Sequence, residues 1–278
     1  MKLVTYDAGQ GPRVGILDGT TVLDAGFDGD MVAFIEAGAP VGETILVENA
    51  RLLSPLKPRS LRDFLAFEGH LKNAFARLNR PIPEEWYMVP AFYRGMPDTV
   101  IGPEETVPYP SYTEKLDHEL ELAAIIGKEG KDVPREAADG YIFGYTIWND
   151  LSARDTQALE LPVGMGPSKA KDWDGSNVLG PCIVTADEVD AGNLTMSVRV
   201  NGETWGEDNA ANMHHKFEDM ISYASQAQTI YPGEIFGSGT AEGGAGIETD
   251  RYLHEGDLVE MEIEGIGVLR NRIGEKGA

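Results

Sequence analysis

The sequence predicts an α+β protein that is dominated by β-strands and has a small N-terminal β-rich lobe. Three observations support this fold class: strand-like apolar runs fill the chain after residue 103, few stretches have a helical period, and two prolines in SPLKPRS interrupt the chain near residue 55. We therefore expect a small domain over residues 1–55 and a larger one over residues 56–278. A chain of this length can bury the apolar core that such an arrangement needs.

The N-terminal lobe is expected to contain short strands joined by tight turns. The runs KLVTYD and RVGILDGTTVLDA are rich in alternating apolar residues, and Asp18-Gly19 favours a two-residue hairpin turn. A short amphipathic helix is expected near DMVAFIEAG.

Two helices are expected in the larger domain. Apolar residues at positions 61, 64, 65, 71, 75 and 78 follow a helical period and predict a helix from Leu61 to Leu78. A continuous helix would place Asp63 and His70, seven residues apart, on one face. The second helix is expected from about His215 to Gln228, between strand-like runs that include a hairpin turn at Asn201-Gly202.

Composition and charge exclude several classes of protein. The chain has 46 acidic and 23 basic residues, and a net charge of -23 argues against nucleic acid or an anionic membrane as a partner. It has no apolar run of about 18 residues and no signal-like N-terminus, so we expect a soluble cytoplasmic protein. The single cysteine, Cys182, rules out an internal disulfide and fits a reducing compartment. The acidity resembles that of proteins from salt-loving organisms, in which counterions screen self-repulsion.

The stretch LDHELELAAIIG places acids at alternate positions of one expected strand. Asp117, Glu119 and Glu121 would share a face that continues with Ala123 and Ile125, so this face leads toward the interior. Carboxylates gathered in a buried place repel one another and need a cation, for which hard divalent ions with oxygen ligands are suited. From this segment alone, a solvated acidic face is the alternative.

A second segment supports the metal hypothesis. In YTIWNDLSARDTQ an apolar strand ends with Asn149-Asp150 and passes directly into polar residues, as functional sites at strand ends often do. Asp150 is therefore a candidate third ligand.

Several segments in matching order resemble the fumarylacetoacetate hydrolase family across about residues 56 to 274: LDHELELAAIIG, WNDLSARDTQ, GPSKAKDW, GSGT and YLHEGDLVEMEIEGIG. This resemblance implies a mixed β-roll catalytic domain, a homodimer and a divalent cation, with Mg²⁺ expected first and Mn²⁺ or Ca²⁺ as alternatives. It implies cleavage of a carbon–carbon bond in a diketo acid, and relatives include decarboxylases and isomerases of similar keto acids.

The resemblance implies a role for each acid near the expected metal. Glu119, Glu121 and Asp150 would be the ligands, and Asp63 would be a fourth that many relatives lack. Asp117 is left over, either as a partner of a ligand or as a charge on the strand face.

The same resemblance implies the catalytic groups. His70 would be the general base, because the ordinary pKa of histidine suits proton removal near neutrality, and Glu248 would orient it. Lys171 would stabilise the developing oxyanion, with Lys169 as a close competitor.

The expected substrate contacts are Tyr93 and Thr240, for the substrate carboxylate, and Gln157, beside the lysine. Arg154 would either bind the substrate carboxylate or pair with Asp155.

By this resemblance we expect a metal-dependent hydrolase that splits a 2,4-diketo acid, such as an acylpyruvate or a diketo-sugar acid, into a pyruvate-type enolate and a carboxylic acid. Eukaryotic members have tyrosines where this chain has Leu65 and, approximately, Leu161, which argues against fumarylacetoacetate as the substrate. One alternative is an oxaloacetate decarboxylase or a keto-enol isomerase of a ring-cleavage diacid. The other is a non-enzymatic cation-binding structural protein.

Overall fold

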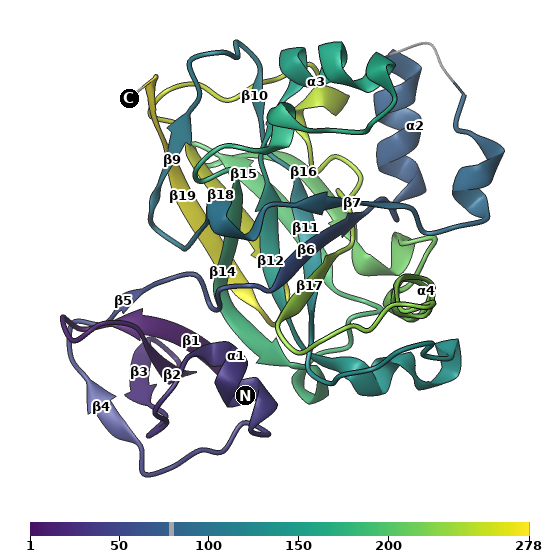
Figure 1. Cartoon of the computed structure of the whole chain (residues 1–278). Helices are drawn as coiled ribbons and strands as arrows, with labels where there is room; N and C mark the ends of the chain where they lie inside the picture. Colours follow the sequence, from purple (N-terminus) through teal and green to yellow (C-terminus); the bar gives the residue numbers. More distant parts are fainter. Residues whose placement is uncertain (78–80, 278) are drawn as a thin grey trace.

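The computed structural model describes residues 1–77 and 81–277, and strands form most of it (Figure 1). The largest sheet has the strand order β4-β3-β2-β1-β14-β12-β11-β17-β6-β7, with β5 paired to β1 and β8 paired to β14. Its strands are β1 (Lys2–Asp7), β2 (Arg13–Asp18), β3 (Thr21–Asp24), β4 (Ile45–Val47), β5 (Arg51–Leu52), β6 (Ser60–Phe64), β7 (Phe92–Gly95), β8 (Val100–Ile101), β11 (Leu120–Ile126), β12 (Ile142–Asp150), β14 (Asn177–Thr185) and β17 (Glu234–Gly237).

A second sheet has the order β16-β15-β18-β19-β9, and two short strands, β10 and β13, pair separately. Their bounds are β9 (Thr106–Tyr109), β10 (Leu116–Asp117), β13 (Ser152–Ala153), β15 (Thr195–Val200), β16 (Glu203–Asn209), β18 (Leu258–Ile263) and β19 (Gly267–Lys276). Parallel pairs, such as β17 with β6 and β19 with β9, occur beside antiparallel ones, so the expected mixed, β-rich architecture is confirmed.

Short helices lie around the sheets (Figure 1). The α-helices are α1 (Met31–Glu36), α2 (Glu68–Arg77), α3 (Arg154–Glu160) and α4 (Phe217–Ala224), and the 3-10 helices named below are η1 (Glu84–Tyr87), η3 (Arg135–Tyr141), η5 (Lys169–Lys171) and η8 (Gly246–Glu248). No described helix is long and apolar enough to cross a membrane.

The N-terminal lobe has the expected hairpin and helix. Strands β2 and β3 pair up to Asp18 and Thr21, and Gly19 between them has a φ of +59°, which glycine adopts readily. Figure 1 shows this lobe at one end of the molecule, where β1 pairs with β14 and so extends the large sheet. The division at residue 55 stays a prediction.

The helix predicted from Leu61 to Leu78 was wrong over its first part. Residues 60–64 form strand β6, and α2 begins only at Glu68; Leu78 lies outside the described residues. Strand β6 lies between β17 and β7 and is buried on both faces, so its residues do not alternate between apolar and polar as a half-exposed strand would. Asp63 and His70 therefore lie on different elements.

The other predicted elements of the larger domain are present. Helix α4 occupies the middle of the segment expected from His215 to Gln228. Asn201 and Gly202, with φ of 52° and 78°, form the two-residue turn between β15 and β16.

Strand β11 determines where the acidic residues lie. It is buried along its whole length between β12 and β17, and Ala123 and Ile125 are fully buried in an apolar core. The prediction that the acidic face continues into the interior is confirmed. The acids therefore lie at the start of β11, where the apolar core ends.

Candidate functional site

Four buried carboxylates from three strands and an adjoining residue meet at one end of the large sheet. One oxygen of each lies within 4.8 Å of the others, and the members of this carboxylate cluster are Asp63, Glu119, Glu121 and Asp150. Strand pairing explains the convergence, because β11 and β12 are antiparallel neighbours and the backbone N–H of Asp150 donates to the carbonyl of Glu119. The three expected ligands thus lie together, and Asp63 joins them from β6.

Asp117 does not join the cluster, because the regular strand is interrupted after it. Strand β10 ends at Asp117 and β11 begins at Leu120, while Glu119 forms an isolated bridge with Ala245. The Asp117 carboxylate instead accepts hydrogen bonds from Arg154 and from the backbone of η8.

Two buried cations contact Glu119. Lys171 Nζ lies 2.6 Å from Glu119 Oε2, and Arg154 Nη2 lies 2.5 Å from Glu119 Oε1. Burial would raise the pKa of Glu119, but Lys171 and Arg154 hold it below its ordinary value, and nearby His70 adds to this. Burial would likewise lower the pKa of Lys171, but its ion pairs with Asp150 and Glu119 raise it. Both groups are therefore charged.

The cluster also contains carboxylate oxygens that the described part of the protein leaves without a hydrogen-bond partner. Four of its carboxylate oxygens have no hydrogen-bond partner within the described residues: Asp63 Oδ1, Asp150 Oδ1 and both oxygens of Glu121. Burial and the neighbouring acids raise the pKa of Asp63 and of Glu121 well above ordinary values. Free, buried carboxylate oxygens are the donor set that Mg²⁺, Mn²⁺ and Ca²⁺ prefer, so this cluster fits a divalent cation.

A histidine–carboxylate pair lies beside the cluster. His70, on α2, places Nδ1 2.8 Å from Oε1 of Glu248, the last residue of η8. The other oxygen of Glu248 accepts hydrogen bonds from Asn73 and from the backbone of Gly243, both at 2.8 Å. Burial would raise the pKa of Glu248, but the hydrogen bond with His70 lowers it. An ionised Glu248 favours the imidazole tautomer with hydrogen on Nδ1, which leaves Nε2 free to accept a proton.

Comparison with known proteins agrees with this geometry. Residues 60–274 match the family described as "Fumarylacetoacetate (FAA) hydrolase C-terminal". The chain belongs to the fumarylacetoacetate hydrolase family. Oxaloacetate tautomerase FAHD2A, mitochondrial, from Homo sapiens is 32% identical over 300 residues, which cover 98% of this chain and 91% of that protein.

Solved structures of the family share the fold over almost the whole chain. A fumarylacetoacetate hydrolase from Exiguobacterium antarcticum has a TM-score of 0.83 and 26% identity, covering 99% of each chain. A 5-carboxymethyl-2-hydroxymuconate delta-isomerase from Mycobacterium smegmatis has a TM-score of 0.80 and 26% identity, covering 99% of this chain and 100% of its own. The family therefore includes proteins named for different reactions, and this chain is one of its enzymes.

The structure distinguishes between the two candidate lysines of this family member. Lys171 is buried and donates to Glu119 and Asp150. Lys169 is exposed, and its ammonium group donates to the backbone carbonyl of Asp172. Only Lys171 of the two contacts the carboxylate cluster.

The four expected substrate contacts lie in different surroundings. Tyr93 donates its hydroxyl to Asp150 Oδ2 at 2.6 Å, and burial raises the pKa of Tyr93. Gln157 accepts a hydrogen bond from Arg154 at 3.0 Å, while Thr240 is buried just after β17.

Arg154 contacts acids other than the one considered from the sequence. Asp155 accepts hydrogen bonds from the Thr113 hydroxyl and the Glu114 backbone, and no ion pair joins it to Arg154 in the described part of the chain.

Two residues near Glu248 were missed from the sequence. Asn73 donates to the Glu248 carboxylate, and Arg77 donates to its backbone carbonyl at 2.9 Å. Asn73 lies three residues after His70 on the same helix, and residues three apart share a helix face. This spacing could have indicated Asn73 from the sequence.

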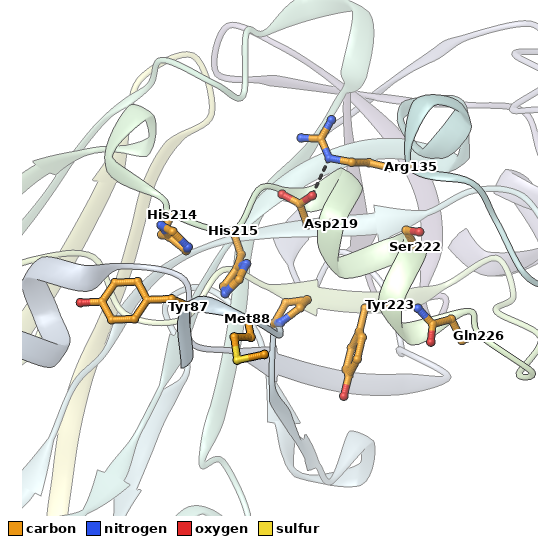
Figure 2. A pocket seen from close by; sticks show the side chains of 10 residues that line it. Tyr87, Met88, Arg135, His214, His215, Asp219, Ser222, Tyr223 and Gln226 are labelled. Atoms are coloured by element: carbon orange, nitrogen blue, oxygen red, sulfur yellow. Dashed lines mark hydrogen bonds and ion pairs between the residues drawn. The ribbon is translucent and has the colours of Figure 1, made fainter. Parts of the chain in front are cut away.

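A separate hollow of about 380 Å³ lies on the surface, away from the carboxylates (Figure 2). In Figure 2, Tyr87, the last residue of η1, and Met88 lie on one side, Tyr223 of α4 lies on the other, and the ion pair between Arg135 and Asp219 is at the top of the view. No member of the carboxylate cluster lines this hollow. We place the candidate active site at the carboxylate cluster, where the ionisable groups converge.

Proposed function

We propose that the protein hydrolyses a carbon–carbon bond in a 2,4-diketo acid, by way of the enolate of a 2-oxo acid. The observation that carries this proposal is the contact between His70 and Glu248 beside a cluster of carboxylates. A buried base with its own orienting carboxylate, placed near a separate buried ammonium group, suits a reaction that both removes a proton and stabilises an oxyanion.

A divalent cation is part of the proposal, with Mg²⁺ first and Mn²⁺ or Ca²⁺ as alternatives. It would be held by the carboxylates of Asp63, Glu119, Glu121 and Asp150. When bound, the ion would supply positive charge that stabilises an enolate.

The side chains of the chain itself account for the other steps. His70, oriented by Glu248, takes a proton from a water molecule, and this water attacks the carbonyl remote from the carboxylate. Lys171 stabilises the oxyanion that forms there. The bond between that carbon and the neighbouring CH₂ then breaks, and the proton that His70 took from water passes to the CH₂ carbon, which returns His70 to its neutral form. One acylpyruvate and one water give one carboxylic acid and one pyruvate.

The groups proposed to bind substrate are Tyr93, Arg154, Gln157 and Thr240, which would hold its carboxylate and oxo groups. By the family resemblance, Leu65 and, approximately, Leu161 stand where eukaryotic members have tyrosines, which favours an acyl group that needs no polar contact from these side chains.

Tautomerisation of oxaloacetate is the second candidate. The relatives that are 32% identical over almost the whole chain include several named oxaloacetate tautomerases. In this reaction His70 would carry a proton between carbon and oxygen of the substrate, and no water would be consumed. Decarboxylation of oxaloacetate and isomerisation of a ring-cleavage diacid use the same enolate and belong to the same group of alternatives.

Product analysis tests these candidates. The purified protein is incubated with a panel of acylpyruvates, diketo-sugar acids and oxaloacetate in H₂¹⁸O, with Mg²⁺ or with a chelator. Hydrolysis predicts two acids with ¹⁸O in the new carboxylate; tautomerisation predicts faster loss of enol absorbance without new products; decarboxylation predicts pyruvate from oxaloacetate. No turnover of any compound would support a cation-binding protein without activity.

We also propose a homodimer, as the family resemblance implied, and a cytoplasmic location. Light scattering measures the mass of the particle, and a mass of one chain would contradict the dimer.

A further inference from the structure

Asp117, the acid left outside the cluster, is a fully buried carboxylate with four hydrogen-bond donors around it. Its Oδ1 accepts from the backbone N–H of Gly246 at 2.7 Å and of His118 at 2.9 Å. Its Oδ2 accepts from Arg154 Nε at 2.7 Å and from the backbone N–H of Ile247 at 3.0 Å. A carboxylate that accepts this many bonds is held in one orientation.

These bonds connect the two halves of the candidate site. On one side, Arg154 contacts Asp117 through Nε and Glu119 through Nη2. On the other side, Gly246 and Ile247 are the first two residues of η8, whose last residue, Glu248, contacts His70. Asp117 is therefore linked to the carboxylate cluster through one residue, Arg154, and to His70 through the single turn η8.

The backbone around η8 shows why a side chain is needed there. The segment is joined to the strand by backbone bonds at its two ends, from Leu120 N–H to the Gly244 carbonyl and from Leu253 N–H to the Leu116 carbonyl. Between these points two side chains hold the segment: Asp117 accepts from the first two backbone N–H groups of η8, and Arg77 donates to the Glu248 carbonyl. A Cβ on Gly246 would lie 1.9 Å from the Arg251 carbonyl oxygen and 2.7 Å from Asp117 Oδ1, so the turn is fitted closely around the carboxylate.

We propose that Asp117 is a positioning residue that fixes the His70–Glu248 pair relative to the carboxylate cluster. It acts through η8 on Glu248 and through Arg154 on Glu119. The inference rests on the proposed function only in treating His70 as the base, because every hydrogen bond that links Asp117 to Arg154 and to η8 joins groups of the protein itself.

The test is Asp117→Asn. The amide keeps one acceptor oxygen, but in either orientation its NH₂ group faces a backbone N–H of η8, that of Gly246 or that of Ile247, so the turn must shift. We expect kcat to fall by roughly 10- to 100-fold with little change in KM, as is typical when a group that supports a ligand or base is removed. A loss of packing alone would not separate kcat from KM in this way.

A second measurement needs neither metal nor substrate. The chain has five histidines, so ¹⁵N NMR can resolve His70, which is assigned by the loss of its signal in His70→Gln. In the wild type we expect hydrogen on Nδ1, and in Asp117→Asn a mixture of tautomers. Unchanged nitrogen shifts of His70 in a folded Asp117→Asn protein would overturn the inference, whether or not any diketo acid is turned over.

Asp155→Asn is the matched control. This carboxylate also accepts backbone N–H bonds, from Glu114 at 2.8 Å and Thr156 at 2.9 Å, but it does not contact the cluster or η8. The His70 signal and kcat should stay as in the wild type. If Asp117→Asn does not fold, Asp117→Glu keeps the charge and displaces the carboxylate by one methylene. It should also shift the His70 signal, and an unshifted signal in that variant overturns the inference as well.

Discussion

Lys171 Nζ lies 2.6 Å from Glu119 Oε2 in a buried ion pair, whereas the Lys169 ammonium, two residues earlier, faces the backbone carbonyl of Asp172 at the surface. The two lysines belong to the same 3-10 turn, η5, and differ only in which way the turn directs them. Lys171 can therefore be tested by substitution, with the same substitution at Lys169 as the control.

Lys171→Met should lower kcat by roughly 10²- to 10³-fold, as removal of an oxyanion-stabilising donor typically does. Lys169→Met should keep nearly wild-type kcat, because its ammonium does not reach the cluster. Steady-state kinetics on the best diketo acid compare the two. Equal losses in both variants would remove Lys171 from the proposed role.

His70→Ala should lower the hydrolytic rate by roughly 10²- to 10⁴-fold, the range for loss of a general base. His254→Ala, at an exposed position, is the control and should be nearly unaffected. Rates are measured by loss of enol absorbance. A wild-type rate of hydrolysis without His70 would exclude it as the base.

Asp63→Asn tests whether the cluster has a fourth ligand. Its carboxylate has a free, buried oxygen near those of the other acids, so we expect Mn²⁺ binding to weaken by at least roughly tenfold. Isothermal titration calorimetry measures the affinity. Asp98→Asn, whose side chain is 79% exposed, is the control; unchanged affinity in Asp63→Asn would restrict the site to three protein ligands.

The pKa of Glu121 predicts how the stability of the metal-free protein depends on pH. Because burial and nearby acids raise this pKa in the folded chain, Glu121 contributes stability below about pH 4, near its unfolded pKa, and this contribution is lost as the pH rises through the folded value. With a chelator present, the melting temperature of Glu121→Gln should therefore increase relative to that of the wild type as the pH is raised above about 4.

Added divalent cation should reverse this order. The wild type should gain about 2.7 kcal/mol at a free ion concentration of 100 times Kd, and Glu121→Gln should gain less. Differential scanning fluorimetry measures both series, with Glu129→Gln at an exposed position as the control. A melting difference between wild type and Glu121→Gln that does not vary with pH would contradict the assigned burial effect.

The net charge of -23 predicts that salt stabilises the fold. Surface acids repel one another, and the Debye length falls from about 10 Å at 0.1 M to about 3 Å at 1 M salt. The midpoint of urea unfolding should therefore rise with KCl over this range. An equal midpoint at both concentrations would show that self-repulsion contributes little to stability.

Local sequence patterns indicated three members of the carboxylate cluster. Alternation along one strand and the polar switch at the end of another indicated Glu119, Glu121 and Asp150, because side-chain facing and strand ends are properties of a few consecutive residues. The family resemblance paired His70 with Glu248, which are 178 residues apart. That separation is beyond any local pattern.

Patterns failed where burial or distant contacts decide the outcome. Strand β6 was read as helix because it is buried on both faces, and this placed Asp63 on the wrong element. Arg154 was considered with its neighbour Asp155, but its partners are Asp117 and Glu119, more than 30 residues away in the chain.

By itself, then, the sequence determined a β-rich member of this family with acids at the start of one buried strand and at the end of its neighbour. Only the tertiary structure decided that Asp63 joins them, that Lys171 rather than Lys169 faces them, and that Asp117 turns away to hold η8. The reason is physical. The face of a strand on which a side chain lies follows from its position among a few consecutive residues, whereas the partner of a buried charge depends on which distant donors the fold brings within hydrogen-bond distance.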